Sequence, residues 1–200
     1  MMIASTQNSF ITPEEYLQLE ADSDIKHEYI DGEIYDMAGA TDTHVTIAGN
    51  IFALLLAHLR GSGCRTFISD MKVKIERKNR FFYPDVIVTC ETQDRENSTF
   101  KQFPRLIIEV LSDSTEAFDR GDKFADYQSL PSLQEYVLIN TTKARIECFR
   151  RTAEGLWLLQ FYELEQKQFE LSSVDFSGTI SDVYEQVEFE RASNDDPVDR

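Results

Sequence analysis

The sequence predicts an α/β fold in which a mixed β-sheet is flanked by helices and preceded by an N-terminal helix and a hairpin. Apolar, β-branched runs at residues 81–88 and 105–112 are typical of strands that are buried on both faces. A helical pattern at residues 119–129 separates the second run from a further strand at 135–139, and such a crossover usually joins parallel neighbours. The Asp-Gly pair within residues 27–37 predicts an antiparallel hairpin.

The N-terminal half of the chain carries clear helix signals. Thr12 is a candidate N-cap, and Pro13 suits the first turn of a helix. Glu15 completes a capping box with Thr12, so we expect a short helix that ends near Asp22. A longer helix is expected from about residue 43 to residue 60, where apolar side chains recur at helical spacing.

Further strands and loops follow from the alternation of apolar and polar runs. We expect one strand over residues 64–75, a polar turn at 77–80 and a polar loop at 91–104. Hairpin-like runs occupy residues 145–150 and 156–163. These runs and the crossover together predict a sheet with both parallel and antiparallel neighbours.

The length of 200 residues suits a single domain, expected over residues 1–190, and the composition of residues 191–200 predicts a disordered tail. No apolar run approaches the length of a membrane span, and the N-terminus lacks the pattern of a secretory signal. Cys64, Cys90 and Cys148 are odd in number and widely spaced, which favours reduced core thiols in a cytoplasmic protein.

The charge balance argues against tight, non-specific binding of nucleic acid. The chain has 36 acidic and 20 basic residues, a net charge of −16, whereas nucleic acid attracts basic surfaces. One cluster of basic residues stands out, made of Lys72, Lys74, Arg77, Lys78 and Arg80. This cluster suits either contact with a phosphate backbone or a solvated strand end and turn.

Each of the two central strands carries one carboxylate, Asp85 or Glu109, where a strand buried on both faces should carry none. A buried charge needs a partner, and a metal ion is one such partner. Mg²⁺ prefers oxygen ligands, so the functional interpretation is a metal site with the Val110 carbonyl as a third oxygen. The alternatives are a turn at Pro84-Asp85 that ends a strand pairing, and a structural ion pair at Glu109.

Lys123 lies on the apolar and aromatic face of the helix expected at residues 119–129. A lysine is seldom buried without a partner, so we expect this one to point toward the two carboxylates. Its charge would there stabilise a phosphate transition state and help to orient or deprotonate the attacking water. The alternative is a lysine whose stem packs on the core while its amine reaches solvent.

These residues resemble a known group of enzymes. Pro84-Asp85, followed by Glu109 in a hydrophobic strand, is similar to the motif of the PD-(D/E)XK nuclease superfamily. A longer resemblance, to the Uma-type restriction endonuclease family, rests on residues 109–112, 119–124, Tyr127, 130–136, 31–34, 37–39 and His44. The resemblance spans roughly residues 10–185 and implies a restriction-endonuclease-like fold.

The resemblance also implies a function, that of a Mg²⁺-dependent endonuclease that hydrolyses the phosphodiester bonds of nucleic acid, with Mn²⁺ as a possible substitute. Asp85 and Glu109 would hold the metal. The superfamily motif places its lysine two residues after the acid, where this chain has Leu111. The resemblance therefore implies that the catalytic lysine has migrated to the next helix, as Lys123. The expected partners are DNA and a second copy of the chain.

Two other functions are open at this point. A catalytically inactive protein with the nuclease fold could bind or regulate a partner, as the acidic charge and the displaced lysine suggest. Alternatively, Asp85, Glu109 and Lys123 form a buried salt-bridge network in a structural interaction domain.

Four more side chains are accessory candidates. His44 is either a core or capping histidine or a border of the site, and Glu33 is a further candidate acid. Trp157 and Phe161 are candidates for a dimer interface, although core packing would explain these aromatic residues as well.

Overall fold

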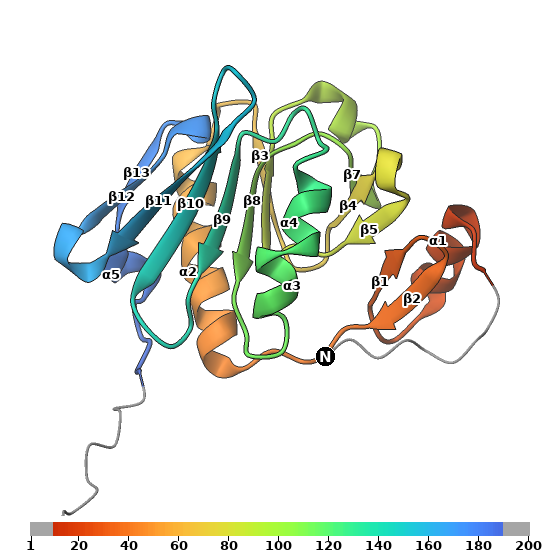
Figure 1. The fold of residues 1–200 in the computed structure, drawn as a ribbon, viewed down its shortest axis with the longest axis horizontal. Coiled ribbons are helices and arrows are strands. Elements are labelled where there is room, and N and C mark those ends of the chain that lie inside the picture. Colours follow the sequence, from red (N-terminus) through yellow and green to blue (C-terminus); the bar gives the residue numbers. More distant parts are fainter. Residues whose placement is uncertain (1–9, 190–200) are drawn as a thin grey trace, which may run out of the picture.

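The computed structural model describes residues 10–189, and a six-stranded sheet lies at its centre (Figure 1). Its strands, in spatial order, are β11 (Trp157–Glu163), β10 (Arg145–Arg151), β9 (Glu135–Ile139), β8 (Pro104–Val110), β6 (Val86–Thr89) and β3 (Arg65–Ile68). β8 and β9 run parallel, and the other neighbours are antiparallel. The predicted mixed sheet and the parallel pair after the crossover are confirmed.

A second, five-stranded sheet carries the N-terminal hairpin. Its order is β2 (Glu33–Asp36), β1 (His27–Ile30), β5 (Arg80–Phe82), β4 (Lys72–Ile75) and β7 (Phe100–Lys101). Helix α1 (Pro13–Asp22) covers it through Tyr16, whose ring lies 5.1 Å from those of Tyr29 and Phe81. This aromatic cluster fixes the hairpin beside the central sheet, so that residues of β1 can contribute to a site there.

Helices cover both faces of the central sheet (Figure 1). The helices and the remaining strands are α2 (Asp42–His58), α3 (Glu116–Arg120), α4 (Asp122–Tyr127), β12 (Gln168–Leu171), β13 (Phe176–Thr179) and α5 (Ile180–Val183), with short 3-10 helices η1 (Glu76–Lys78), η2 (Thr92–Arg95), η3 (Leu164–Gln166) and η4 (Ser172–Val174). Ile108 and Val110 of β8 pack in the cluster that contains α2, whereas Ile107 and Leu111 pack in the cluster that contains α4. Because side chains alternate along a strand, Glu109 points to the α4 face.

The local turn and capping predictions are confirmed. Thr12 caps α1, and its side chain and that of Glu15 form the reciprocal bonds of a capping box. The hairpin turns at Asp31 and Gly32, with φ angles of 50° and 98°. Both residues of a type I′ turn need positive φ, which is the reason that Asp-Gly is found there.

Two expected elements are each divided in the structure. The strand expected over residues 64–75 is two strands, because Ser69 has a φ of 53° and turns the chain from β3 in one sheet to β4 in the other. The helix expected over residues 119–129 is α3 followed by α4. Gly121, with φ −108° and ψ −103°, lies outside helical geometry and separates them.

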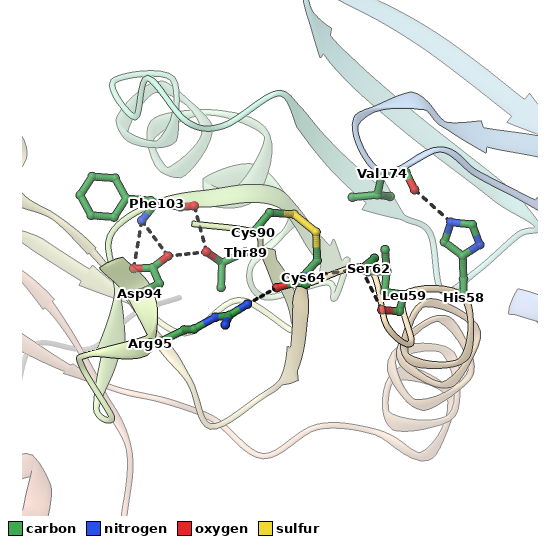
Figure 2. The surroundings of a disulfide bond; sticks show 11 residues. His58, Leu59, Ser62, Cys64, Thr89, Cys90, Asp94, Arg95, Phe103 and Val174 are labelled. Atoms are coloured by element: carbon green, nitrogen blue, oxygen red, sulfur yellow. Dashed lines mark hydrogen bonds between the residues drawn. A yellow bond between two sulfur atoms is a disulfide. The ribbon is translucent and has the colours of Figure 1, made fainter. Parts of the chain in front are cut away.

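The prediction of three reduced cysteines is wrong for Cys64 and Cys90, which form a disulfide (Figure 2). Arg65 pairs with Thr89 across β3 and β6, so the two cysteines are the next residues along these antiparallel strands. The sequence hid this contact because it depends on the pairing of two strands that bring together cysteines 26 residues apart. Cys148 is free and buried, as expected.

Between residues 10 and 189 no helix is long and apolar enough to cross a membrane. The tail expected at residues 191–200 lies outside the described residues. A single domain over residues 1–190 stays a prediction from the sequence.

We expect reduction of the disulfide to lower the free energy of unfolding by about 2–4 kcal/mol, because the bond restricts the unfolded chain. Urea unfolding with and without dithiothreitol measures this difference, and the variant with both Cys64→Ser and Cys90→Ser should not respond to the reductant. Equal stability of oxidised and reduced wild-type protein would contradict the prediction.

Candidate active site

The junction of the two sheets places Asp85 beside Glu109. Val86 pairs with Ile108 across β6 and β8, so Asp85 and Glu109 are the next residues along the two strands. Asp85 Oδ2 accepts a hydrogen bond of 2.7 Å from the Val110 main-chain N–H. Asp85 lies between β5 in one sheet and β6 in the other, because Pro84 cannot donate to a strand ladder and the pairing stops there.

Lys123 joins three carboxylates. Its Nζ lies 3.0 Å from Glu109 Oε1, 3.2 Å from Glu28 Oε1 and 3.3 Å from Asp119 Oδ1. All four residues are buried, with 2–5% of their surface exposed. They come from β8, β1, α3 and α4, so the cluster depends on the packing of the hairpin and both short helices against the sheet.

The charges in this cluster are unbalanced. Burial raises the pKa of Glu109 well above its ordinary value, and Lys123 offsets this effect only in part. Burial raises the pKa of Glu28 in the same way. For Lys123, burial lowers the pKa, but the nearby carboxylates outweigh it and the net shift is upward. The Lys123 ammonium therefore stays charged at neutral pH, whereas burial disfavours ionisation of Glu28 and Glu109.

Tyrosines and main-chain groups hold the carboxylates in place. Tyr127 donates to Glu109 Oε1 at 3.3 Å, and the Tyr83 N–H donates to Glu28 Oε1 at 3.4 Å. Tyr136 donates to the main-chain oxygen of Asp119 at 2.9 Å. One carboxylate oxygen of Asp119, Oδ1, is buried and accepts no hydrogen bond from residues 10–189. The Lys123 ammonium, 3.3 Å away, is its ion-pair partner.

His44 lies on the solvent side of the cluster. Its Nε2 is 2.9 Å from Asp85 Oδ1, and the two side chains are 16% and 18% exposed. Burial lowers the pKa of His44, but the hydrogen bond and the charge of Asp85 outweigh it, so the pKa is raised overall. Its main-chain N–H bonds to Thr41 Oγ1, the N-cap of α2. His44 and Asp85 are more exposed than the buried carboxylates, so approach from solvent is from their side.

The structure brings Asp85, Glu109 and Lys123 together. Their neighbours Glu28 and Asp119 were not identified as site residues from the sequence. Asp119 precedes Lys123 by one helical turn, a spacing that could have signalled it. Glu28 gave no such signal, because a four-residue hairpin strand does not reveal that both of its faces are covered.

Glu33, the other candidate acid of the hairpin, is not part of the cluster. Its side chain is exposed and accepts a hydrogen bond of 2.6 Å from Tyr35. Val110, whose carbonyl is the expected third oxygen ligand, does contact the cluster. Its main-chain N–H donates a hydrogen bond to Asp85.

The basic cluster at residues 72–80 is largely neutralised. Lys78 and Arg80 both pair with Asp126, and Lys74 pairs with Glu76. Lys72 Nζ donates to the hydroxyl of Tyr83 at 3.0 Å. These contacts favour a paired strand end and turn over an open phosphate-binding strip.

The donor groups of the cluster suit a divalent cation. Carboxylate oxygens are the ligands that Mg²⁺ and Mn²⁺ prefer. Three buried carboxylates, those of Glu28, Glu109 and Asp119, surround a single ammonium, and Asp85 adjoins Glu109. In the part of the chain that the structure describes, however, no three His, Cys, Asp or Glu side chains already form a metal-binding group.

We expect Glu109→Gln to keep or raise the free energy of unfolding in protein freed of divalent ions with EDTA. The folded-state pKa of Glu109 lies above its ordinary value of 4.5, so stability is lost as pH rises from that value through the folded-state pKa. Glutamine is neutral and avoids this loss. In urea unfolding, the free energy of unfolding of the variant should therefore rise relative to that of the wild type between pH 5 and pH 8.

The control for this comparison is Glu33→Gln, which removes an exposed carboxylate of the hairpin. A loss of a few kcal/mol in Glu109→Gln alone would instead identify a closed, structural salt-bridge network.

The chain is similar to known proteins over most of its length. The family model Uma2, described as "Putative restriction endonuclease", matches residues 13–181. Two uncharacterized proteins of Synechocystis sp. are 39% and 37% identical, slr1290 over 90% of this chain and 94% of its own length, and sll1609 over 86% and 97%.

A solved structure agrees in fold. The crystal structure of a putative nuclease from Anabaena variabilis superimposes with a TM-score of 0.70 at 16% identity, and the match covers 87% of this chain and 97% of that one. The predicted α/β, restriction-endonuclease-like architecture and the family resemblance are confirmed. The chain belongs to the Uma2 family, described as putative restriction endonucleases.

Proposed function

We propose that this protein is a metal-dependent endonuclease that hydrolyses phosphodiester bonds of nucleic acid. Asp85 and Glu109 would hold Mg²⁺, or Mn²⁺ in its place, and the Val110 carbonyl would add a third oxygen. The observation that carries the proposal is the buried Lys123 ammonium, 3.0 Å from Glu109 Oε1, at the strand ends where Asp85 and Glu109 are adjacent. Family membership supports nuclease chemistry in general terms.

Each residue of the site would have a distinct role in the reaction. Lys123 has a raised pKa and stays protonated, so it suits stabilising negative charge on the phosphate and does not suit deprotonating water. His44 and Asp85 form a hydrogen-bonded pair at the exposed side, where they can orient an incoming water or phosphate oxygen. Tyr127 and Val110 hold Glu109 and Asp85 in place. A bound divalent ion would lower the pKa of its water and neutralise phosphate charge.

We also propose that the substrate is DNA and that the protein assembles as a homodimer. Strand β11 is an edge strand, and exposed apolar residues there would form the dimer surface: Leu156, Leu158, Leu159, Phe161 and Leu164. Trp157 is half-buried instead and packs on Phe124, at 5.3 Å between ring centroids.

We also propose a cytoplasmic location. The disulfide weighs against it, because thiols stay reduced in the cytoplasm.

A second candidate function is a protein with the nuclease fold that binds or regulates a partner without hydrolysis. Two observations favour it. Lys123 occupies the space between three carboxylates. Three residues of the basic cluster, Lys74, Lys78 and Arg80, are paired with acids. A nuclease must therefore open part of this ion network to admit a metal ion and a phosphate.

Cleavage of nucleic acid tests the proposal. We expect the wild type to cut supercoiled plasmid or single-stranded DNA in Mg²⁺ or Mn²⁺ and to be inactive in EDTA. Glu109→Gln should cut slower by about 10²–10³-fold, the size typical of losing a group that stabilises transition-state charge. Gel electrophoresis of the products over time gives the rates, with an RNA substrate assayed in parallel.

Glu33→Gln is the matched control and should cut at the wild-type rate, because this carboxylate is exposed and outside the cluster. If the wild type cuts no substrate with either ion, the second candidate function replaces the nuclease. Equal rates for wild type and Glu109→Gln would remove Glu109 from the catalytic site.

A further inference from the structure

A polar pocket of about 490 Å³ lies at the end of the central sheet that is remote from the carboxylate cluster. Its walls come from the adjacent strands β8, β9 and β10 and from η4. Arg105, near the start of β8, lines it, whereas Glu109 lies four residues further along that strand, roughly 13 Å away at the rise of an extended chain. The pocket contains none of the proposed catalytic residues.

Glu135, the buried carboxylate of the pocket, is already fully used. It accepts hydrogen bonds of 3.1 Å from both the N–H and the hydroxyl of Ser172. Ser173 donates in the same two ways at 2.9 and 2.6 Å, and Arg150 Nε donates at 2.6 Å. Glu135 therefore neutralises Arg150 and shapes the wall at η4, and it is not available to the other cations of the pocket.

Two further arginines of the pocket have no carboxylate partner. Within residues 10–189, the half-buried side chain of Arg105 makes neither a hydrogen bond nor an ion pair. Arg151 Nη2 donates to the main-chain oxygens of Gln128 and Leu130 at 2.7 and 3.0 Å, and its guanidinium lies 4.8 Å from the Trp157 ring centroid. Arg151 Nε is buried and without a partner. Two positive charges therefore border this pocket in a chain whose net charge is −16.

A third unsatisfied group lines the same pocket. The Ser132 hydroxyl is buried and has no hydrogen-bond partner in the described part of the chain. Buried polar atoms are nearly always hydrogen-bonded in proteins, and leaving one unpaired costs free energy. The pocket therefore has three sources of unused hydrogen-bond donors: Arg151 Nε, the Ser132 hydroxyl and the Arg105 side chain. Such a set of donors suits an oxyanion.

We propose that this pocket binds a small molecule through its phosphate group. Guanidinium forks match the oxygens of phosphate, and both arginines and Ser132 line this one pocket. The volume exceeds what a bare phosphate needs, so the rest of a small molecule has room. Exposed Glu91 at the rim and buried Glu135 disfavour the continuous negative charge of a nucleic-acid strand.

The test is an NMR titration of the metal-free, full-length protein with inorganic phosphate, at constant ionic strength maintained with chloride. We expect saturable shifts of the Arg151 Nε–H and Gln134 signals. Arg105→Gln should weaken binding at least about tenfold, the loss of one charge-assisted hydrogen bond. Ser132→Ala should weaken it less, without a change of charge.

Two matched controls locate the site. Arg60→Gln removes an exposed arginine outside the pocket, and Glu109→Gln alters the carboxylate cluster. Both should bind phosphate as the wild type does, whether or not the protein cuts DNA. The proposal is overturned if the wild type shows no saturable shift or if Arg60→Gln weakens binding as much as Arg105→Gln. Shifts caused by a single-stranded oligonucleotide and not by phosphate would also overturn it.

Discussion

One buried ammonium holds the site together. Lys123 Nζ lies within 3.0–3.3 Å of carboxylate oxygens of Glu28, Glu109 and Asp119, and all four residues are nearly inaccessible to water. Without the lysine, three buried acids would face one another at short range with no cation between them, which is costly in a buried site. The hairpin, the central sheet and the two short helices therefore meet at this contact.

The same network explains how the fold positions chemistry. Strand β8 carries Glu109 on the face that α4 covers, and Lys123 and Tyr127 of α4 both contact it. Asp119 of α3 and Lys123 of α4 are four residues apart on either side of Gly121, and their side chains form an ion pair. Asp85 reaches the cluster because the chain passes between two sheets at Pro84. The carboxylates are consequently held by main-chain geometry and not only by their charges.

The sequence revealed the parts of the site that interrupt a local pattern. Asp85 and Glu109 are charges within apolar strands, and Lys123 is a charge on an apolar helical face, so each violates the rule for its own element. Glu28 violates no rule of a short hairpin strand, because its burial depends on a helix and a sheet that are distant in the sequence.

Contacts between residues that are distant in the sequence also limited how much of the fold could be predicted. The capping box of α1, the Asp-Gly turn and the crossover between β8 and β9 follow from residues close together in the chain, and these predictions are confirmed. The Cys64–Cys90 bond required the register of β3 against β6, and that register required the turn at Ser69. The register of these strands and the turn at Ser69 leave no signal in residue composition.

We propose that Asp85 and Glu109, beside Lys123, hold a divalent metal ion. Anomalous X-ray diffraction from crystals soaked in Mn²⁺ would locate that ion. We expect a manganese peak in contact with oxygens of both Asp85 and Glu109, with the Lys123 ammonium displaced from at least one of its carboxylates. A map with no peak at these residues, and with Lys123 still bound to Glu28, Glu109 and Asp119, would contradict it.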